Sequence, residues 1–301
     1  MPRTILSFGE ILWDFLPDGL FAGGAPLNGA YHLHRHGHRV HLVSGLGKDL
    51  LGDEMTRRIR NWGLDTETIT YHAGLPTGYV RAELSDTGDA HYDITTSVAW
   101  DQILVDEDVV RAAVGADAVV FGSLAQRTPF NRAGLDRLLT VLPAEAWRVF
   151  DVNLRPPHDD LERVAELAPQ ATLLKLNAEE AARLATGAEK ETPGEEESHA
   201  RQLAERYRCP TICVTAGSRG AGLLRDGKWH WEPGRPIEVA DTVGAGDSFL
   251  AALVSHLLQG NLSNQASLAR ACRLGEWVAT KRGATPAYDA STPLEPSDSA
   301  S

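Results

Sequence analysis

Short apolar segments alternate with longer amphipathic segments along most of the chain. The apolar segments are rich in branched side chains and predict strands at residues 5–8, 40–43, 118–121, 148–152, 172–176 and 211–215. Helical periodicity separates several of them, at residues 53–62, 132–142, 161–167 and 178–185. Repeated strand–helix–strand order predicts a mostly parallel sheet with helices on both faces.

Two hairpins interrupt this order. Residues 79–84 and 91–95 alternate with period two around a polar turn at 85–89, which predicts an antiparallel pair. This pair is too short for a core of its own, so we interpret it as a lid. A second hairpin closes at residues 229–231, after the Asp226-Gly227 turn.

Two polar stretches are expected to lie outside the packed core. Residues 187–198 (GAEKETPGEEES) are rich in Gly, Pro and Glu and predict a solvated loop. Residues 293–301 predict a polar, frayed tail.

Composition narrows the class of protein. The 301 residues allow one large α/β domain or two smaller ones, and a net charge of −12 argues against nucleic acid or anionic membranes as partners. No apolar run approaches the ~20 residues of a membrane span. Three cysteines without paired CxxC motifs indicate a reducing compartment. We therefore expect a cytoplasmic enzyme.

Common nucleotide fingerprints are missing from the sequence. It contains neither GxGxxG nor GxxxxGK[ST], so the nicotinamide-dinucleotide and P-loop classes lack their signatures.

A glycine-rich segment, DTVGAGD at 241–247, precedes an apolar helix predicted at 248–259. Gly244, Ala245 and Gly246 let backbone amides converge at a helix start, an arrangement suited to a transferring phosphoryl group. Asp247 beside such an anion site suits a base that takes a proton from an attacking hydroxyl. The alternative is a helix N-cap at Asp247.

A second glycine-rich segment, AGGAPLN at 22–28, precedes a helix predicted at 29–36. Gly24 allows close approach of a ligand, and Asn28 offers both a donor and an acceptor, as a polyol requires. Gly9-Glu10 and Asp14 follow the first strand, where open α/β sheets bind ligands. For Asp14 the alternative is an ordinary loop carboxylate.

Together these two segments resemble the signatures of the ribokinase-like (PfkB) carbohydrate kinases, over nearly the whole chain. Gly9-Glu10, Asp14 and the GGAP-x-N string are similar to those of fructokinases. The resemblance implies a three-layer αβα fold with a mostly parallel central sheet and a small β-sheet lid. It implies one kinase domain at 1–292, with the lid inserted at about 12–21 and 74–98.

The resemblance also implies roles for the site residues. Asp247 would be the general base, and Gly244, Ala245 and Gly246 the anion hole. Asp14, Gly24 and Asn28 would hold the sugar hydroxyls. Asn153 and Arg155, in the D-x-N-x-R string, would face the phosphate and sugar end; a capping Asn and a surface Arg are the alternative.

For the nucleotide and metal ions the resemblance implies a further set of residues. The nucleotide set is Asn177, Thr215, Gly217, Gly220 and Gly283, and Glu180 would organise Mg²⁺ through water. A capping box of Asn177 with Glu180 is compatible with that role. Asp241 and Val243, with residues 280–287, would form a monovalent-cation (K⁺) site.

Five histidines crowd one stretch of the chain, at His32, His34, His36, His38 and His41. His32 and His36 share a helix face, but no HExxH pattern accompanies them and Gly37 interrupts the helix, so packing is favoured over metal binding.

The sequence therefore predicts an ATP-dependent sugar kinase, of fructokinase type, that uses ATP and Mg²⁺. The resemblance alone implies a homodimer through the lid. Acceptors such as 2-keto-3-deoxygluconate or ribose remain alternatives, as does a sugar-binding regulator without catalysis.

Overall fold

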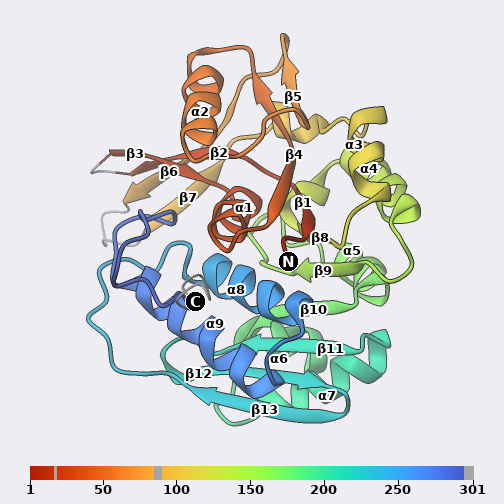
Figure 1. The fold of residues 1–301 in the computed structure, drawn as a ribbon, viewed down its shortest axis with the longest axis vertical. Coiled ribbons are helices and arrows are strands. Elements are labelled where there is room, and N and C mark those ends of the chain that lie inside the picture. Colours follow the sequence, from red (N-terminus) through yellow and green to blue (C-terminus); the bar gives the residue numbers. More distant parts are fainter. Residues whose placement is uncertain (17–18, 85–89, 295–301) are drawn as a thin grey trace, which may run out of the picture.

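A large central sheet organises the computed structural model, which describes residues 1–16, 19–84 and 90–294 (Figure 1). Its nine strands among those residues are, in spatial order, β13 (Lys228–Pro233), β12 (Gly220–Arg225), β11 (Thr211–Thr215), β10 (Leu173–Asn177), β9 (Trp147–Asp151), β8 (Ala118–Gly122), β1 (Thr4–Phe8), β4 (Arg39–Gly47) and β5 (Ile69–His72). Neighbours from β5 to β11 run parallel, and β12 and β13 are antiparallel. The mostly parallel sheet and the second hairpin are confirmed.

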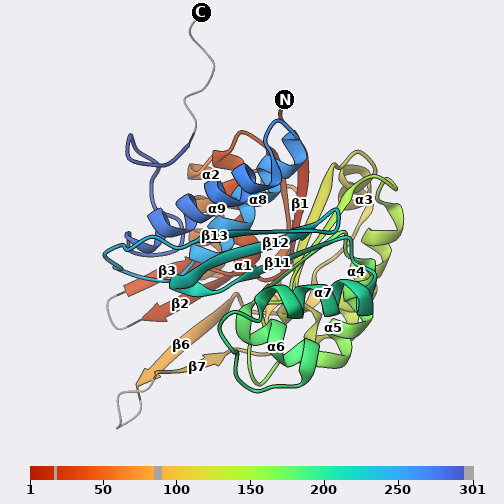
Figure 2. The same cartoon turned by 90° about the horizontal axis from the view of Figure 1, so that it is seen from below.

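Helices cover both faces of this sheet (Figure 2). One face carries α1 (Ala25–Arg35), α2 (Leu50–Asn61), α8 (Ala245–Gln259) and α9 (Asn264–Ala279); the other carries α3 (Glu107–Val114), α4 (Pro129–Val141), α5 (Leu161–Leu167), α6 (Ala178–Thr186) and α7 (Glu196–Tyr207). Successive residues of a strand point to opposite faces. Ile5 therefore belongs to the core under α1 and α8, and Leu6 to the core under α4 to α7.

A smaller sheet of four described strands stands beside the central one. Its order is β3 (Gly19–Gly23), β2 (Leu12–Leu16), β6 (Gly78–Leu84) and β7 (Ala90–Ile94). β2 pairs parallel with β6, and the outer pairs are antiparallel. The hairpin predicted at 79–95 is β6–β7; its turn at 85–89 lies outside the described residues. Because β2 follows β1 after three residues, the smaller sheet arises at the carboxyl edge of the central sheet.

Among the described residues the connections contain four single-turn 3₁₀ helices, η1 (Ala99–Gln102), η2 (Leu124–Arg127), η3 (Ala168–Gln170) and η4 (Gly217–Arg219). No helix in the described parts of the chain is long and apolar enough to cross a membrane.

The prediction of a solvated loop at 187–198 is wrong for its last three residues, because α7 begins at Glu196. Glu196 is buried and pairs with Arg219 at 2.9 Å. Acidic residues are favourable in a first helical turn, and the turn that follows buries His199 and Ala200. The glutamate run therefore starts a helix. Of the predicted tail, residues 295–301 lie outside the described part.

Candidate active site

Two motifs that are 219 residues apart in the sequence meet at one hydrogen bond. The Nδ2 of Asn28, on α1, donates to Oδ2 of Asp247, on α8, over 2.8 Å. Asn28 is buried, and α1 and α8 lie next to each other on one face of the sheet (Figure 1). The N-cap alternative for Asp247 is wrong, because Gly244 is the N-cap and Asp247 is the third residue of α8.

The glycine at the start of α8 is required by its surroundings. Gly244 has a left-handed backbone (φ 77°), and a Cβ there would lie 2.4 Å from the Cβ of Ala284. The first turn of any helix leaves its N–H groups without helical partners. In α8 the first of these N–H groups, that of Ala245, donates to Thr242 O at 3.3 Å. Gly246 and Asp247 are the next two residues of this first turn.

Asp247 borders a small cavity together with Glu10, Asp151 and Asn153. Glu10 follows β1, Asp151 ends β9 and Asn153 follows it. The carboxyl ends of parallel strands form the edge where α/β sheets bind ligands. Burial raises the pKa of Asp247, the bond from Asn28 lowers it, and the Asp151 carboxylate raises it. Asn153 has a left-handed backbone (φ 41°), which Asn tolerates better than most residues.

Asp14 on β2 and Gly24, directly after β3, lie where the smaller sheet meets the residues around Glu10. A Cβ on Gly23 would lie 2.1 Å from Oδ2 of Asp14, and one on Gly24 would lie 2.4 Å from the carbonyl oxygen of Glu10. Burial raises the pKa of Asp14 to about 6, while Arg155 lowers it. Asp14, Gly24, Asn28 and Asp247 thus surround one region.

Arg155 is exposed at the edge of this region and donates from Nη1 to Leu154 O at 3.0 Å. Its positive charge lowers the pKa of Glu10, Asp14 and Asp247. Arg155 is therefore the cation that faces the three carboxyl groups from the loop after β9.

Lys175 is a site residue that the sequence analysis missed. It is buried on β10, and its Nζ lies 3.0 Å from Oδ1 of Asp151. The same Nζ would be 3.5 Å from a Cβ on Gly246. Burial opposes the charge of Lys175, but Asp151 and Glu180 raise its pKa. A lone Lys inside the apolar strand LLKLN is the signal that could have identified it.

The capping box of Asn177 and Glu180 is confirmed. Asn177 accepts from Glu180 N–H, and Glu180 Oε2 accepts from Asn177 N–H at 2.8 Å. The other oxygen, Oε1, accepts from Leu154 N–H at 2.7 Å. Burial raises the pKa of Glu180. Glu180 therefore fixes the loop that carries Asn153 and Arg155.

The remaining predicted nucleotide residues lie farther along the sheet edge. Thr215 ends β11, which is separated from β9 by β10, and its Oγ1 donates to Leu176 O at 3.4 Å. Gly217 and Gly220 follow, and a Cβ on Gly220 would lie 2.1 Å from Glu232 O. β10 therefore lies between Thr215 at the end of β11 and Asp151 at the end of β9.

Asp241 joins the turn before α8 to the segment after α9. Its Oδ1 accepts from Val243 N–H and its Oδ2 from Gly283 N–H, each at 3.0 Å. The three residues predicted for the cation site and the nucleotide loop are thus held together by one carboxylate.

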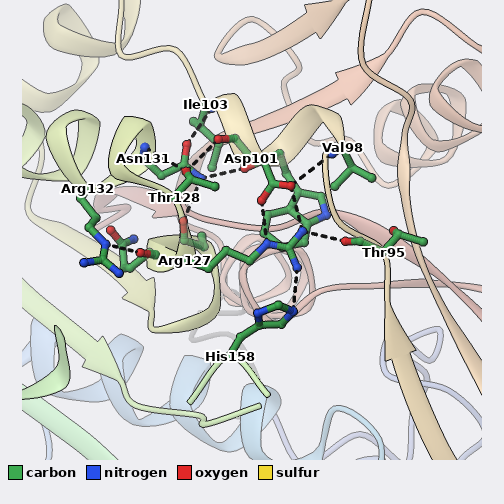
Figure 3. A network of polar contacts seen from close by, with 12 residues as sticks. Thr95, Val98, Asp101, Ile103, Arg127, Thr128, Asn131, Arg132 and His158 are labelled. Carbon is green, nitrogen blue, oxygen red and sulfur yellow. Dashed lines mark hydrogen bonds and ion pairs between the residues drawn. The ribbon is translucent and has the colours of Figure 1, made fainter. Parts of the chain in front are cut away.

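Arg127 lies at the centre of a polar network beside the site (Figure 3). It makes a bidentate pair with Asp101 and donates to Thr95 O, and its guanidinium lies 3.8 Å from the ring centroid of Trp100. Thr95 in turn exchanges hydrogen bonds with Tyr79 on β6. Arg127 also contacts His158, in the loop of Arg155, at 3.3 Å. This network connects the smaller sheet to that loop.

Several of the clustered histidines serve as packing and anchoring groups. His32 bonds to Tyr288 Oη and Ala284 O, at 2.8 and 2.9 Å, and His38 bonds to Ser255 Oγ at 2.8 Å. Burial lowers the pKa of His32 to about 4, which keeps it neutral.

The chain as a whole is similar to a known protein family and to several of its members. Residues 19–290 match the model of the pfkB family carbohydrate kinases. A fructokinase of Klebsiella pneumoniae is 27% identical over 299 residues, with 94% of this chain and 95% of that protein covered.

Solved structures share the fold. The crystal structure of a fructokinase with bound ATP from Xylella fastidiosa has a TM-score of 0.81 at 23% identity and covers 95% of this chain and 94% of that one. The apo form of a putative ribokinase II from E. coli has a TM-score of 0.80 at 20% identity, with 95% of each chain covered. The predicted ribokinase-like fold class is confirmed.

The family match spans most of the chain, and the two motifs predicted to carry its chemistry meet at the Asn28–Asp247 hydrogen bond. This chain belongs to the pfkB family of carbohydrate kinases and is a phosphotransferase that acts on a sugar alcohol group.

Proposed function

We propose that this kinase is a fructokinase, which transfers the γ-phosphoryl group of ATP to a primary hydroxyl of fructose. The observation that carries the proposal is the 2.8 Å bond between Asn28 and Asp247. This bond places the amide of Asn28, the proposed sugar ligand, next to the carboxylate of Asp247 in the first turn of α8. The relatives named as fructokinases support this choice of acceptor.

In the proposed reaction Asp247 accepts the proton of the attacking hydroxyl while the hydroxyl oxygen attacks phosphorus in line. The bond from Asn28 orients the Asp247 carboxylate, and burial makes that carboxylate a stronger base. The N–H groups of the first turn of α8, with Gly246 at their centre, stabilise the charge that develops on the phosphoryl oxygens. Lys175, next to Gly246, adds positive charge there.

ATP is proposed to lie along the edge between α8 and the residues Asn177, Thr215, Gly217, Gly220 and Gly283. Mg²⁺ fits a site in which phosphates and water supply most ligands, because no cluster of three His, Cys, Asp or Glu side chains able to hold a metal occurs in the described residues. Both oxygens of Glu180 accept backbone N–H groups, so Glu180 would hold the ion through water. Bound Mg²⁺ would neutralise phosphate charge.

A K⁺ site is proposed at the turn of Asp241 and Val243. The Asp241 carboxylate holds Val243 and Gly283 in place through their N–H groups. This leaves backbone carbonyl groups of that turn and of residues 280–287 as the natural ligands of a monovalent cation.

The smaller sheet, at about 12–21 and 74–98, is proposed to act as a lid on the domain at 1–292. Asp14 on β2 would bind the sugar, and closure would exclude water and suppress hydrolysis of ATP. We also propose a homodimer through this sheet, since Phe15 and Leu20 expose 38% and 36% of their surface on it.

An acidic sugar such as 2-keto-3-deoxygluconate is the second candidate acceptor. The observation in its favour is that Arg155 is exposed and that its charge acts on the carboxyl side chains of the site, such as that of Asp14. A guanidinium in that place suits a substrate carboxylate.

A coupled assay of ADP release tests the proposal, with the full chain and fructose, ribose, 2-keto-3-deoxygluconate or adenosine as acceptor. We expect the highest kcat/KM with fructose and negligible ADP release without sugar. Preference for the keto acid would support the second candidate. Release of ADP independent of sugar would indicate a nucleotide hydrolase, and sugar binding without ADP release would indicate a regulator.

A further inference from the structure

Glu10 is a buried carboxyl group beside the proposed base to which the mechanism above gives no role. It follows β1, exposes 4% of its surface, and its Oε2 has no hydrogen-bond partner. A buried polar atom without a partner costs about 1–3 kcal/mol in folded proteins. Such an atom in an active site therefore indicates a ligand, a water molecule or a proton that it binds.

The cavity that Glu10 borders has room for water. It offers about 30 Å³ to water and is bordered on its polar side by Glu10, Ser123, Asp151, Asn153 and Asp247. Of these, Asp151 is already paired with Lys175. About 10–15 Å³ is enough for one water molecule. The Oγ of Ser123, which is also buried without a partner, can supply a second polar contact. The remaining border includes Leu33, Leu250 and Val254, so bulk solvent does not compete on that side.

The charged groups that face Glu10 suit it to gain and lose a proton near neutrality. Burial raises the pKa of Glu10 to about 7. The backbone N–H groups of Glu10 and Ala25 and the positive charge of Arg155 lower it, and Asp247 raises it. A carboxyl group beside a carboxylate takes up a proton more readily than it would alone.

We propose that Glu10 relays the reaction proton: a water in this cavity carries to Glu10 the proton that Asp247 takes from the sugar hydroxyl. The inference rests on the proposed function. The sugar O–H bond breaks and Asp247 gains the proton as the new O–P bond forms and ADP leaves. Protonated Asp247 then gives a proton to the water, and the water gives one to the ionised Glu10. Asp247 returns to its ionised form, and Glu10 releases its proton to solvent when the product leaves, so no other reactant is needed.

A purely structural role for Glu10 has to be separated from this one. Gly24, the N-cap of α1, has no side chain, and the Ala25 N–H in the first turn of that helix lowers the pKa of the Glu10 carboxyl. Glu10→Gln keeps an oxygen that can face this N–H group but cannot take up the proton. Glu10→Ala removes both functions. The glutamine variant is therefore the informative one.

The test is the pH profile of kcat from pH 5.5 to 9 for the wild type, Glu10→Gln and the control Glu107→Gln. Glu107 begins α3, pairs with Arg137 and has a side chain that is 81% exposed, and it belongs to none of the proposed binding groups. We expect wild-type kcat to rise with pH through about 7, because Glu10 must be ionised. Glu10→Gln should lose this rise and about tenfold or more in kcat, with sugar KM within about twofold. The control should keep the rise.

Each other outcome decides against the relay. An unchanged profile in Glu10→Gln overturns it, and so does a raised KM with unchanged kcat, which would make Glu10 a sugar-binding group. In both cases the wild-type kinase activity stands, so the proposed function survives. A wild type that phosphorylates no sugar overturns both. Should thermal melting show that Glu10→Gln is unfolded, Ser123→Ala carries the test: kcat should fall at constant KM, and unchanged kcat overturns the relay.

Discussion

Asp247 and Asn28 carry the proposed chemistry at the scale of single residues. The hydrogen bond between them positions the base, so a substitution that keeps this bond while removing the negative charge isolates proton transfer. Asparagine at position 247 has that property, because its side-chain oxygen can still accept from Asn28.

We therefore predict that Asp247→Asn lowers kcat by about 10²–10⁴-fold and leaves sugar affinity nearly unchanged. Steady-state kinetics and calorimetric sugar binding measure the two quantities. Asp226→Asn is the matched control: Asp226 is in a left-handed turn that Asn also tolerates, and its side chain is 76% exposed. Near wild-type turnover in Asp247→Asn would mean that another group is the base.

Glu10 gives a second prediction, on stability. Its pKa is raised from 4.5 to about 7 in the folded chain, so the folded state binds more protons than the unfolded state between these values. Stability from this group is present below pH 4.5 and is lost as pH rises through about 7. At about 1.4 kcal/mol per pKa unit, the loss is at most about 3.5 kcal/mol.

Glu10→Gln should therefore be more stable than the wild type at pH 8, and the gain should shrink toward pH 4.5. Urea unfolding at several pH values measures it, with the exposed Glu145→Gln as a control. A gain in stability together with a loss of turnover is typical of a group kept for activity. A Glu10→Gln variant that loses stability at pH 8 would refute the assigned cause.

Sequence patterns were sufficient for some site residues and not for others. Asp247 and Asn28 stand in glycine-rich segments that only a close approach of backbone explains, so both could be recognised. Lys175 and the burial of Glu10 depend on which strands become neighbours: Lys175 meets Asp151 only because β9 and β10 pair. Strand pairing depends on contacts between residues that are distant in sequence. The periodicity of hydrophobic residues gives no information about such contacts.

At the scale of elements, the ends of β1, β8, β9, β10 and β11 were predicted to within one residue, β4 is longer than expected, and β5 was not predicted. Buried parallel strands are continuous apolar runs, so their limits are visible in the sequence. Helix starts were less visible. The helix predicted to begin at 248 begins at Ala245, because a glycine turn is its N-cap. The helix predicted to begin at 29 begins at Ala25 for the same reason.

The Arg127 network gives a prediction about elements, since it holds the end of β7 against η1 and η2 (Figure 3). The side chains of Arg127 and Asp101 are each 8% exposed. Removing one partner of a buried pair typically costs about 3–5 kcal/mol, because the other charge stays buried. Arg127→Met should lose about that much and should raise the sugar KM, because Thr95 loses its anchor.

Urea unfolding and steady-state kinetics check this prediction. Arg111→Met removes an arginine from an exposed pair, with Arg111 76% and Asp108 64% exposed, and should cost less than about 1 kcal/mol. Equal losses in the two variants would mean that burial of the Arg127 pair contributes nothing.

Considered as a whole, the molecule is acidic, yet it is proposed to bind the anion ATP. The net charge of −12 opposes that binding at long range, but screening limits this effect to about 8–10 Å at physiological salt. Local groups must therefore dominate. The N-terminus of α8 and the buried Lys175 supply positive potential within the site.

The smaller sheet gives the last prediction, on the assembly of the whole molecule. Phe15 and Leu20 are register partners on β2 and β3, so they share one face of the sheet, whereas Asp14 points to the other. An exposed apolar pair on the face opposite Asp14, the proposed sugar ligand, suits a contact between two copies, because that contact would leave Asp14 accessible. Burying both side chains would also stabilise the lid strands.

We therefore expect sedimentation velocity to show a dimer at micromolar concentration, and the double variant Phe15→Glu and Leu20→Glu to sediment as a monomer. Charges on that face would have to be desolvated in the dimer, which is costly. Val114→Glu, at a 58% exposed position on α3, is the control and should stay dimeric. A wild type that sediments as a monomer at every concentration would exclude the lid interface. Unchanged dimerisation of the double variant would place the interface on another face.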